Sequence, residues 1–202
     1  EILIGLVGSE MCIRDSIYKE ARRLITLVGD IIKITQMDDQ QLPIQREQLD
    51  LRALCADVLE HLQPAADSAG VHMILEGEAH WINGARQIAD EMVYNLCDNA
   101  IKYNRPGGTV WVRLEARDAE TVALSVEDTG IGIPEEHQSR VFERFYRVDK
   151  NRSREIGGTG LGLSIVKHGA LYHGAALYLN SAPGVGTKIT VVFPKQGPDP
   201  ES

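Results

Sequence analysis

Residues 87–103 read Gln-Ile-Ala-Asp-Glu-Met-Val-Tyr-Asn-Leu-Cys-Asp-Asn-Ala-Ile-Lys-Tyr, and their spacing predicts a helix with two unlike faces. One face is polar, with residues at i, i+4, i+7 and i+8, namely Asn95, Asn99, Lys102 and Tyr103. The other face is apolar at helical spacing and predicts a core contact through Ala89, Met92, Val93, Leu96, Cys97 and Ala100. The polar stripe would suit a metal-bound triphosphate, but a solvated helix face has the same pattern.

The composition indicates an acidic globular chain. Its 202 residues are 43% apolar, which is enough to bury a core, and its net charge is −8. This charge argues against general binding to nucleic acid or to an anionic membrane, so any phosphate must be held by a local site. The chain has three cysteines, Cys12, Cys55 and Cys97, and none of them forms a CxxC pair. This pattern indicates neither a disulfide framework nor a zinc site, and it fits a reducing cytosol.

The first part of the chain is expected to lie outside the globular domain. Residues 17–39 predict a bundle-type helix with a seam at alternating spacings of four and three, formed by Ile17, Ala21, Leu24, Val28 and Ile31. An amphipathic helix folded onto its own domain is the alternative. Residues 1–16 show no sustained period, and Leu6–Ser16 is similar to a translated sequencing adapter, so we treat them as a non-native tail. Residues 40–48 are polar, contain Pro43 and predict a linker.

Residues 49–196 predict one α+β domain, followed by a tail at 197–202. A helix opens at Leu49-Asp50, and strands are expected at 71–76, 81–82, 109–114, 121–127, 175–180 and 187–193. The last two strands are joined by the turn-rich Ser181-Ala-Pro-Gly-Val-Gly. Runs of strands with helices between them favour a two-layer α/β sandwich.

Asp128 is expected to point inward. Period two places it on the apolar face of its strand, with Val122, Leu124 and Val126. A buried carboxylate needs hydrogen-bond donors, and the amino group of a bound heterocycle would serve. Gly130 and Gly132 would let the backbone pass close to a flat ligand. Asp-Thr-Gly is also the aspartic-protease triplet, but that chemistry needs two such carboxylates and the chain has one copy.

A second glycine cluster runs into a helix at Gly157-Gly-Thr-Gly-Leu-Gly-Leu-Ser-Ile-Val-Lys, a geometry that suits phosphate. It matches neither the P-loop nor the dinucleotide fingerprint. Between the two clusters, Val141-Phe-Glu-Arg-Phe-Tyr-Arg-Val-Asp and the polar Lys150-Asn-Arg-Ser-Arg-Glu predict a lid. Arg147, Arg152 and Arg154 would neutralise phosphate there, although a solvated charge run is the commoner explanation for the last two.

In their order along the chain, these motifs resemble the catalytic ATP-binding domain of sensor histidine kinases of two-component systems. The matching pattern is Asn95-Leu-x-x-Asn-Ala-x-Lys-Tyr, Asp128-x-Gly-x-Gly, Phe142-x-x-Phe-Tyr-Arg, Gly158-Thr-Gly-Leu-Gly-Leu and Gly184-x-Gly-Thr. The resemblance covers roughly Leu49 to Pro194 and implies a Bergerat-type ATP-binding fold. Glu20-Ala-Arg-Arg-Leu-x-x-Leu-x-x-Asp-Ile-Ile resembles the second helix of the family's dimerisation and phosphoacceptor hairpin.

The resemblance implies ATP and Mg²⁺ as ligands. Asn99 would coordinate Mg²⁺, and the catalytic residues would be Asn95, Asn99, Lys102 and Arg147. Asp128 would accept from the adenine amino group, with Thr187 near the base, while Phe142 and Phe145 would brace the lid. The full implied ATP-binding set is Asn95, Asn99, Lys102, Tyr103, Asp128, Gly130, Gly132, Phe142, Phe145, Gly158, Thr159, Gly160, Leu161, Gly162 and Thr187.

The acceptor histidine of the family is missing from this pattern. The family phosphorylates a His followed by an acidic residue on the hairpin's first helix, and no histidine of this chain has that context. His168 and His173 are interpreted as structural. We therefore expect transfer of the γ-phosphoryl group to a hairpin supplied by the same homodimeric full-length protein or by another chain, without autophosphorylation of this fragment. Relay to a response regulator receiver domain would follow.

The resemblance also implies a cytoplasmic domain of a membrane-anchored protein, with no nucleic-acid or membrane contact by this fragment. Alternatives remain within the fold. In its ATPase relatives a Glu that acts as general base stands four residues before the metal-binding Asn, and here that position is Asn95, which disfavours hydrolysis. A serine kinase acting on an anti-sigma partner is the second hypothesis, and a nucleotide-binding regulatory module without transfer activity is the third.

Overall fold

The computed structural model describes residues 45–148 and 158–196, together with separate helical residues between Ile17 and Thr35. The expected tails at 1–16 and 197–202 and the polar lid segment with Arg152 and Arg154 lie outside the described residues, as does most of the predicted linker. Within the described ranges, no helix is both long and apolar enough to cross a membrane.

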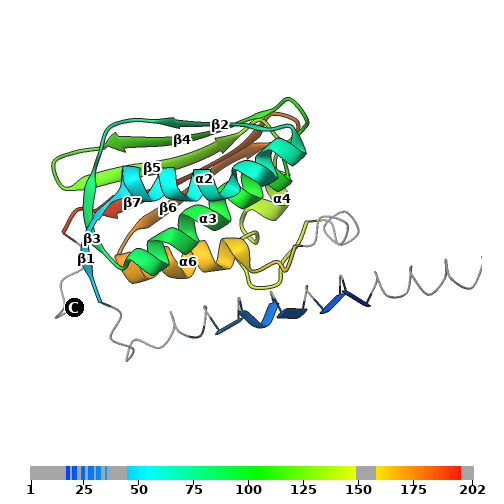
Figure 1. The fold of residues 1–202 in the computed structure, drawn as a ribbon, viewed down its shortest axis with the longest axis horizontal. Coiled ribbons are helices and arrows are strands. Elements are labelled where there is room, and N and C mark those ends of the chain that lie inside the picture. Colours follow the sequence, from blue (N-terminus) through cyan, green and yellow to red (C-terminus); the bar gives the residue numbers. More distant parts are fainter. Residues whose placement is uncertain are drawn as a thin grey trace, which may run out of the picture.

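A five-stranded sheet forms one layer of the domain, in the order β2-β4-β5-β7-β6. Its strands are β2 (His72–Glu76), β4 (Thr109–Ala116), β5 (Thr121–Asp128), β7 (Gly186–Pro194) and β6 (Ala176–Ala182). β2 runs parallel to β4, and the other neighbours are antiparallel. Three helices cover one face of the sheet (Figure 1): α2 (Leu51–Ala69), α3 (Arg86–Lys102) and α6 (Gly162–His173). This arrangement confirms the predicted two-layer α/β sandwich.

A two-stranded ribbon of β1 (Glu47–Asp50) and β3 (Trp81–Gly84) stands at the start of the domain. The sequence placed Leu49 and Asp50 at the opening of a helix, but here Leu49 pairs with Ile82 in an antiparallel ladder. Asp50 then caps α2, because its carboxylate accepts the N–H groups of Arg52 at 2.8 Å and Ala53 at 3.3 Å. A strand of four residues is too short to show the alternation that identifies strands in sequence.

The core lies between the helices and the sheet. The apolar residues predicted for the inner face of the 87–103 helix are all buried, from Ala89 to Ala100. On β5, Val122, Leu124 and Val126 are buried, as the period-two pattern predicted. α3 and α6 approach closely at Gly169, where a Cβ would lie 2.5 Å from the Sδ atom of Met92. At the other end of this contact, Gly162, the first residue of α6, lies beside Asn95 and Asn99 in the C-terminal half of α3.

His173 connects the last turn of α6 to the start of α3 inside the core. This position agrees with its interpretation as a structural residue. Its side chain is 1% exposed. Nδ1 lies 2.8 Å from the carbonyl oxygen of Gly169, and Nε2 lies 3.1 Å from the backbone nitrogen of Ala85, where α3 begins. Because a carbonyl only accepts and an amide N–H only donates, the ring is neutral with its proton on Nδ1. Burial lowers the pKa of this imidazole.

The described residues between Ile17 and Thr35 are helical, and those of the predicted seam are exposed: Ile17, Ala21, Leu24, Val28 and Ile31. The assignment of this helix to a dimerisation hairpin stays a prediction.

Candidate functional site

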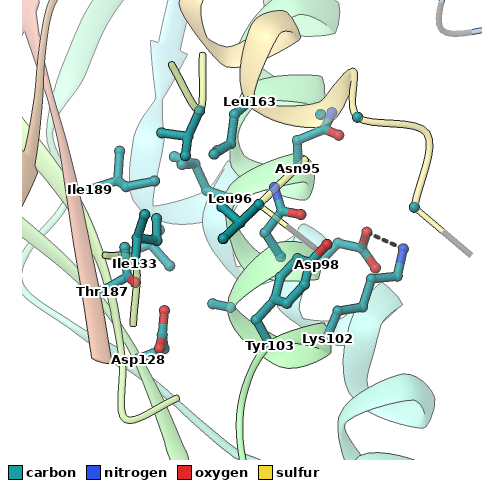
Figure 2. Close-up of a pocket in the computed structure, with 18 of the residues that line it drawn as sticks. Asn95, Leu96, Asp98, Lys102, Tyr103, Asp128, Ile133, Leu163, Thr187 and Ile189 are labelled. Carbon is teal, nitrogen blue, oxygen red and sulfur yellow. Dashed lines mark hydrogen bonds and ion pairs between the residues drawn. The ribbon is translucent and has the colours of Figure 1, made fainter. Parts of the chain in front are cut away.

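A cavity of about 290 Å³ opens between the C-terminal half of α3 and the sheet. Figure 2 shows Asn95, Asp98, Lys102 and Tyr103 projecting from α3, with Asp128, Thr187 and Ile189 on the sheet side. Residues from the segments 131–133, 141–148 and 158–163 complete the wall. The cavity therefore joins parts of the chain that lie far apart in sequence.

Most of the implied site residues line this cavity: Asn95, Asn99, Lys102, Tyr103, Asp128, Gly132, Arg147, Gly158, Thr159, Gly160, Gly162 and Thr187. Four do not line it, namely Gly130, Phe142, Phe145 and Leu161. Gly130 is buried behind the wall and donates its N–H to Oδ1 of Asp128 at 2.7 Å. Leu161 is fully buried in a small cluster with Ile165. These two residues shape the site without facing it.

Phe145 contacts the glycine loop through its backbone. Its N–H donates to the carbonyl of Gly160 at 2.9 Å, and its φ of +63° is unusual for a residue with a side chain. The ring itself is 56% exposed. The aromatic residue of this segment that lines the cavity is Tyr146, whose hydroxyl lies 2.7 Å from Nδ1 of His137. The lid-bracing role implied for Phe142 and Phe145 stays a prediction.

The two amides of α3 meet the first residue of α6. Nδ2 of Asn95 donates to the carbonyl of Glu91 at 2.8 Å, which orients the amide. A Cβ at Gly162 would lie 2.8 Å from Oδ1 of Asn95, which is a collision, and 3.3 Å from Nδ2 of Asn99, which is a tight contact. In the described chain no side chain caps the start of α6. Its first N–H groups and the helix dipole therefore make this corner suitable for an anion.

Two cationic side chains line the cavity, and they differ in whether they already have a partner. Nζ of Lys102 lies 2.6 Å from Oδ2 of Asp98, so this ammonium is already paired. Nε and Nη2 of Arg147 are buried and have no hydrogen-bond partner among the residues that the structure describes. A buried guanidinium nitrogen without an acceptor costs free energy, so a ligand that brought an acceptor to Nε or Nη2 would stabilise Arg147.

The sheet side of the cavity holds a perturbed carboxyl group. Burial raises the pKa of Asp128 to about 6, hydrogen bonds from the backbone of Gly130 and Thr187 oppose this shift, and the charge of Glu127 adds to it. The inward orientation predicted for Asp128 is what the structure shows, since it lines the cavity wall. Its carboxylate can accept a hydrogen bond from a ligand amino group.

The sequence did not identify the apolar part of the wall, which is formed by Ile131, Ile133, Val141, Val148, Leu163 and Ile189. These residues come from loops, α6 and β7 and follow no common pattern, and single apolar residues resemble ordinary core positions. It also missed Asp98, although a usable signal was present. Asp98 stands four residues before Lys102, the spacing at which opposite charges pair on a helix.

The donor set of the cavity suits a Mg²⁺ ion that arrives with phosphate. Within the described ranges, no group of three His, Cys, Asp or Glu side chains is arranged to hold a metal by itself. The side chains with oxygen atoms that line the cavity near the start of α6 include Asn95, Asn99 and Thr159. Mg²⁺ prefers oxygen ligands, retains waters and shares its coordination sphere with substrate phosphates, so this sparse set fits.

Comparisons with known proteins agree with this geometry. Residues 84–197 match the model of a family described as histidine kinase-, DNA gyrase B-, and HSP90-like ATPase. The sensor-like histidine kinase SenX3 of Mycolicibacterium smegmatis is 35% identical over 193 residues, which are 93% of this chain and 49% of that protein. The chain thus spans about half the length of this relative.

Solved structures give the same picture. The mycobacterial sensor histidine kinase MprB superimposes with a TM-score of 0.67 at 32% identity, covering 76% of this chain and 100% of that chain. Full-length ShkA, solved in complex with AMPPNP, superimposes with a TM-score of 0.74 at 24% identity, covering 87% of this chain and 37% of that one. Because the identity to ShkA is only 24%, this similarity shows a shared fold and nothing more.

Proposed function

Because this chain belongs to the histidine kinase-, DNA gyrase B- and HSP90-like ATPases, and among them to the sensor histidine kinase catalytic domains, we propose that its cavity binds Mg-ATP for phosphoryl transfer to a histidine. The observation that carries the proposal is Arg147, which lines the cavity together with two amides and whose buried Nε and Nη2 lack partners in the described chain. A polyphosphate would supply the missing acceptors.

The base would bind on the sheet side. Asp128 would accept a hydrogen bond from the adenine amino group, with Thr187 next to it and Tyr103 on the opposite wall. Apolar side chains such as Ile133 and Ile189 would contact the faces of the ring system. A carboxylate acceptor favours adenine over guanine, because guanine presents a carbonyl where adenine carries its amino group.

The phosphates would bind between α3 and the start of α6. Arg147 and the N–H groups after Gly160 would bind phosphate oxygens, and Lys102 would contribute after exchanging Asp98 for phosphate. Asn99, with Asn95 beside it, would hold Mg²⁺, which neutralises charge on the phosphate oxygens when bound. Positioning of the substrate and neutralisation of its charge provide most of the catalysis in phosphoryl transfer. These residues are of the types that can provide both effects.

Transfer rather than hydrolysis is favoured by Asn95. A carboxamide does not accept a proton from water, and Nδ2 of Asn95 is already engaged with the carbonyl of Glu91. The nearby carboxylate of Asp98 is paired with Lys102. The acceptor would be a histidine on a hairpin supplied by a homodimeric, membrane-anchored full-length protein or by another chain, with relay to a response regulator receiver domain. The kinase domain would then work in the cytoplasm.

Calorimetric titration with Mg-ATP tests the binding site. Asn99→Ala should abolish magnesium-dependent binding and leave the thermal midpoint unchanged, because Asn99 is only partly buried. Asn180→Ala, on the exposed strand β6, is the matched control and should bind like the parent chain. Equal affinity of the Asn99→Ala variant and the parent would refute the metal assignment.

Labelled ATP tests the transfer step. We expect no label on the chain alone and an acid-labile label on an added hairpin that carries a His followed by an acidic residue. Acid-labile label on the chain itself would show that the acceptor is internal. Binding without transfer to any hairpin would favour a nucleotide-sensing module.

A further inference from the structure

Arg105 bridges two segments that form the base side of the cavity. Its Nη2 donates to the carbonyl of Gly184 at 2.7 Å and to the carbonyl of Gly130 at 3.2 Å. Gly130 lies in the loop after β5, Gly184 lies in the turn between β6 and β7, and Arg105 itself follows α3. One guanidinium group therefore connects three separate parts of the chain.

These parts meet backbone against backbone, with little room for adjustment. A Cβ at Gly130 would lie 2.3 Å from the carbonyl oxygen of Tyr103, and one at Gly132 would lie 1.9 Å from that of Ala182. The N–H of Ile131 donates to Tyr103 at 3.1 Å, and the carbonyl of Ile131 accepts from Gly184 at 2.8 Å. Because no side chain fills the space between the segments, hydrogen bonds set the position of the loop.

The same loop orients Asp128. The N–H of Gly130 donates to Oδ1 of Asp128 at 2.7 Å, while the carbonyl of Gly130 accepts from Arg105. The turn on the other side also reaches this residue, since a Cβ at Gly186 would lie 1.9 Å from the carbonyl oxygen of Asp128. A shift of either segment would therefore move the carboxylate relative to the cavity.

We propose that Arg105 is a specificity-determining positioning residue, which fastens the Gly130 loop to the Gly184 turn and so holds the Asp128 carboxylate where it distinguishes adenine from guanine. Arg105 is exposed and does not line the cavity, so it acts through the two carbonyls and not by touching the nucleotide. The inference rests on the proposed function, because it assumes that a purine binds against Asp128.

Calorimetric affinities of the full 202-residue chain for Mg-ATP and Mg-GTP test the proposal. Arg105→Gln removes both hydrogen bonds and should lower the ATP-to-GTP affinity ratio about tenfold, mainly through weaker ATP binding. Arg105→Lys can still reach one carbonyl and should give an intermediate ratio. Arg52→Gln is the matched control, because Nε of Arg52 also donates to a glycine carbonyl, that of Gly77 at 2.9 Å, away from the cavity.

The outcomes separate the two proposals. If the parent chain binds neither nucleotide, or binds both equally, the assignment of Asp128 to the base fails. If the parent discriminates and both Arg105 variants keep its ratio, the role of Arg105 is refuted. A similar loss of the ratio in Arg52→Gln would show a general effect of lost surface hydrogen bonds and would also overturn it. Amide hydrogen exchange should accelerate at Gly130 and Gly184 in Arg105→Gln, and unchanged exchange there would contradict the fastening.

Discussion

Nζ of Lys102 lies 2.6 Å from Oδ2 of Asp98, one helical turn earlier on α3, so the ammonium expected to bind phosphate is paired within its own helix (Figure 2). The side chains are 37% and 20% exposed, which leaves the pair at the rim of the cavity. Phosphate would have to compete with Asp98 for this cation. On the proposed function, the pair would therefore oppose nucleotide binding, whereas Arg147 would favour it.

We expect Asp98→Asn to bind ATP more tightly than the parent chain, by about threefold to tenfold. The substitution frees Lys102 and removes a negative charge from the cavity, and a partly exposed pair of this kind is worth ~1 kcal/mol. The gain should be smaller for ADP, which carries less charge. Calorimetric titration at low salt measures both affinities.

Asp57→Asn is the control for Asp98→Asn, because it breaks the exposed pair with Arg86 at 3.0 Å, away from the cavity. Its ATP affinity should match that of the parent. Weaker ATP binding by Asp98→Asn would mean that Asp98 assists the nucleotide instead of competing with it.

Arg147→Met should stabilise the fold and weaken ATP binding. The substitution removes two buried nitrogens without partners in the described chain, so the free energy of unfolding without nucleotide should rise by about 1–3 kcal/mol. ATP affinity should fall at least about tenfold, because charge-assisted hydrogen bonds to phosphate are lost. Urea denaturation and calorimetry measure the two effects. Arg117→Met, which removes a guanidinium 5.4 Å from the ring of Tyr178 on the sheet, should leave ATP affinity unchanged.

ATP affinity should rise with pH through the titration of Asp128. Its pKa of about 6 leaves the carboxylate mostly protonated at pH 5 and mostly ionised at pH 7, and the ionised form accepts better from an amino group. The affinity of the parent relative to Asp128→Asn should therefore rise about tenfold between pH 5 and pH 7. The comparison at each pH cancels the titration of the nucleotide itself. A constant ratio would exclude Asp128 as the acceptor.

His173 should make the fold sensitive to acid. Burial lowers the pKa of its imidazole from the ordinary 6.5, so the unfolded chain binds more protons there than the folded chain. The stabilisation by the neutral ring is complete above pH 6.5 and is lost as the pH falls toward and through the folded-state pKa. Urea denaturation between pH 7 and pH 5 should show a shallower decline for His173→Phe than for the parent. His72→Gln, at an exposed position, should decline like the parent.

Much of the fold was predictable because its elements carry periodic patterns. The 87–103 helix separates amides from apolar side chains, and β5 alternates up to Asp128, so both elements and their inner faces were identified correctly. β1 was missed because a strand of four residues shows no period and gains its hydrogen bonds only from pairing with β3. The same limit explains the misplaced start of α2.

The site was predictable only in part. The polar residues of α3, Asp128 and the glycine loop have spacings that suggest chemistry, and the structure places them around one cavity. Ile133 and Ile189 carry no such signal, because an apolar residue looks the same in a cavity wall as in a core. Tyr146 stands in the motif Phe142-x-x-Phe-Tyr-Arg, but no role in the site was predicted for it.

The sequence alone determined which sides of α3 and β5 face inward, since periodicity depends on local backbone geometry. Only the tertiary structure decided the surroundings of two arginines. Nε and Nη2 of Arg147 are buried without a partner in the described chain, and Arg105 reaches Gly130 and Gly184 across 25 and 79 positions of sequence. Burial, and hydrogen bonds between distant segments, arise only when the chain closes on itself, and these set the electrostatics of the site.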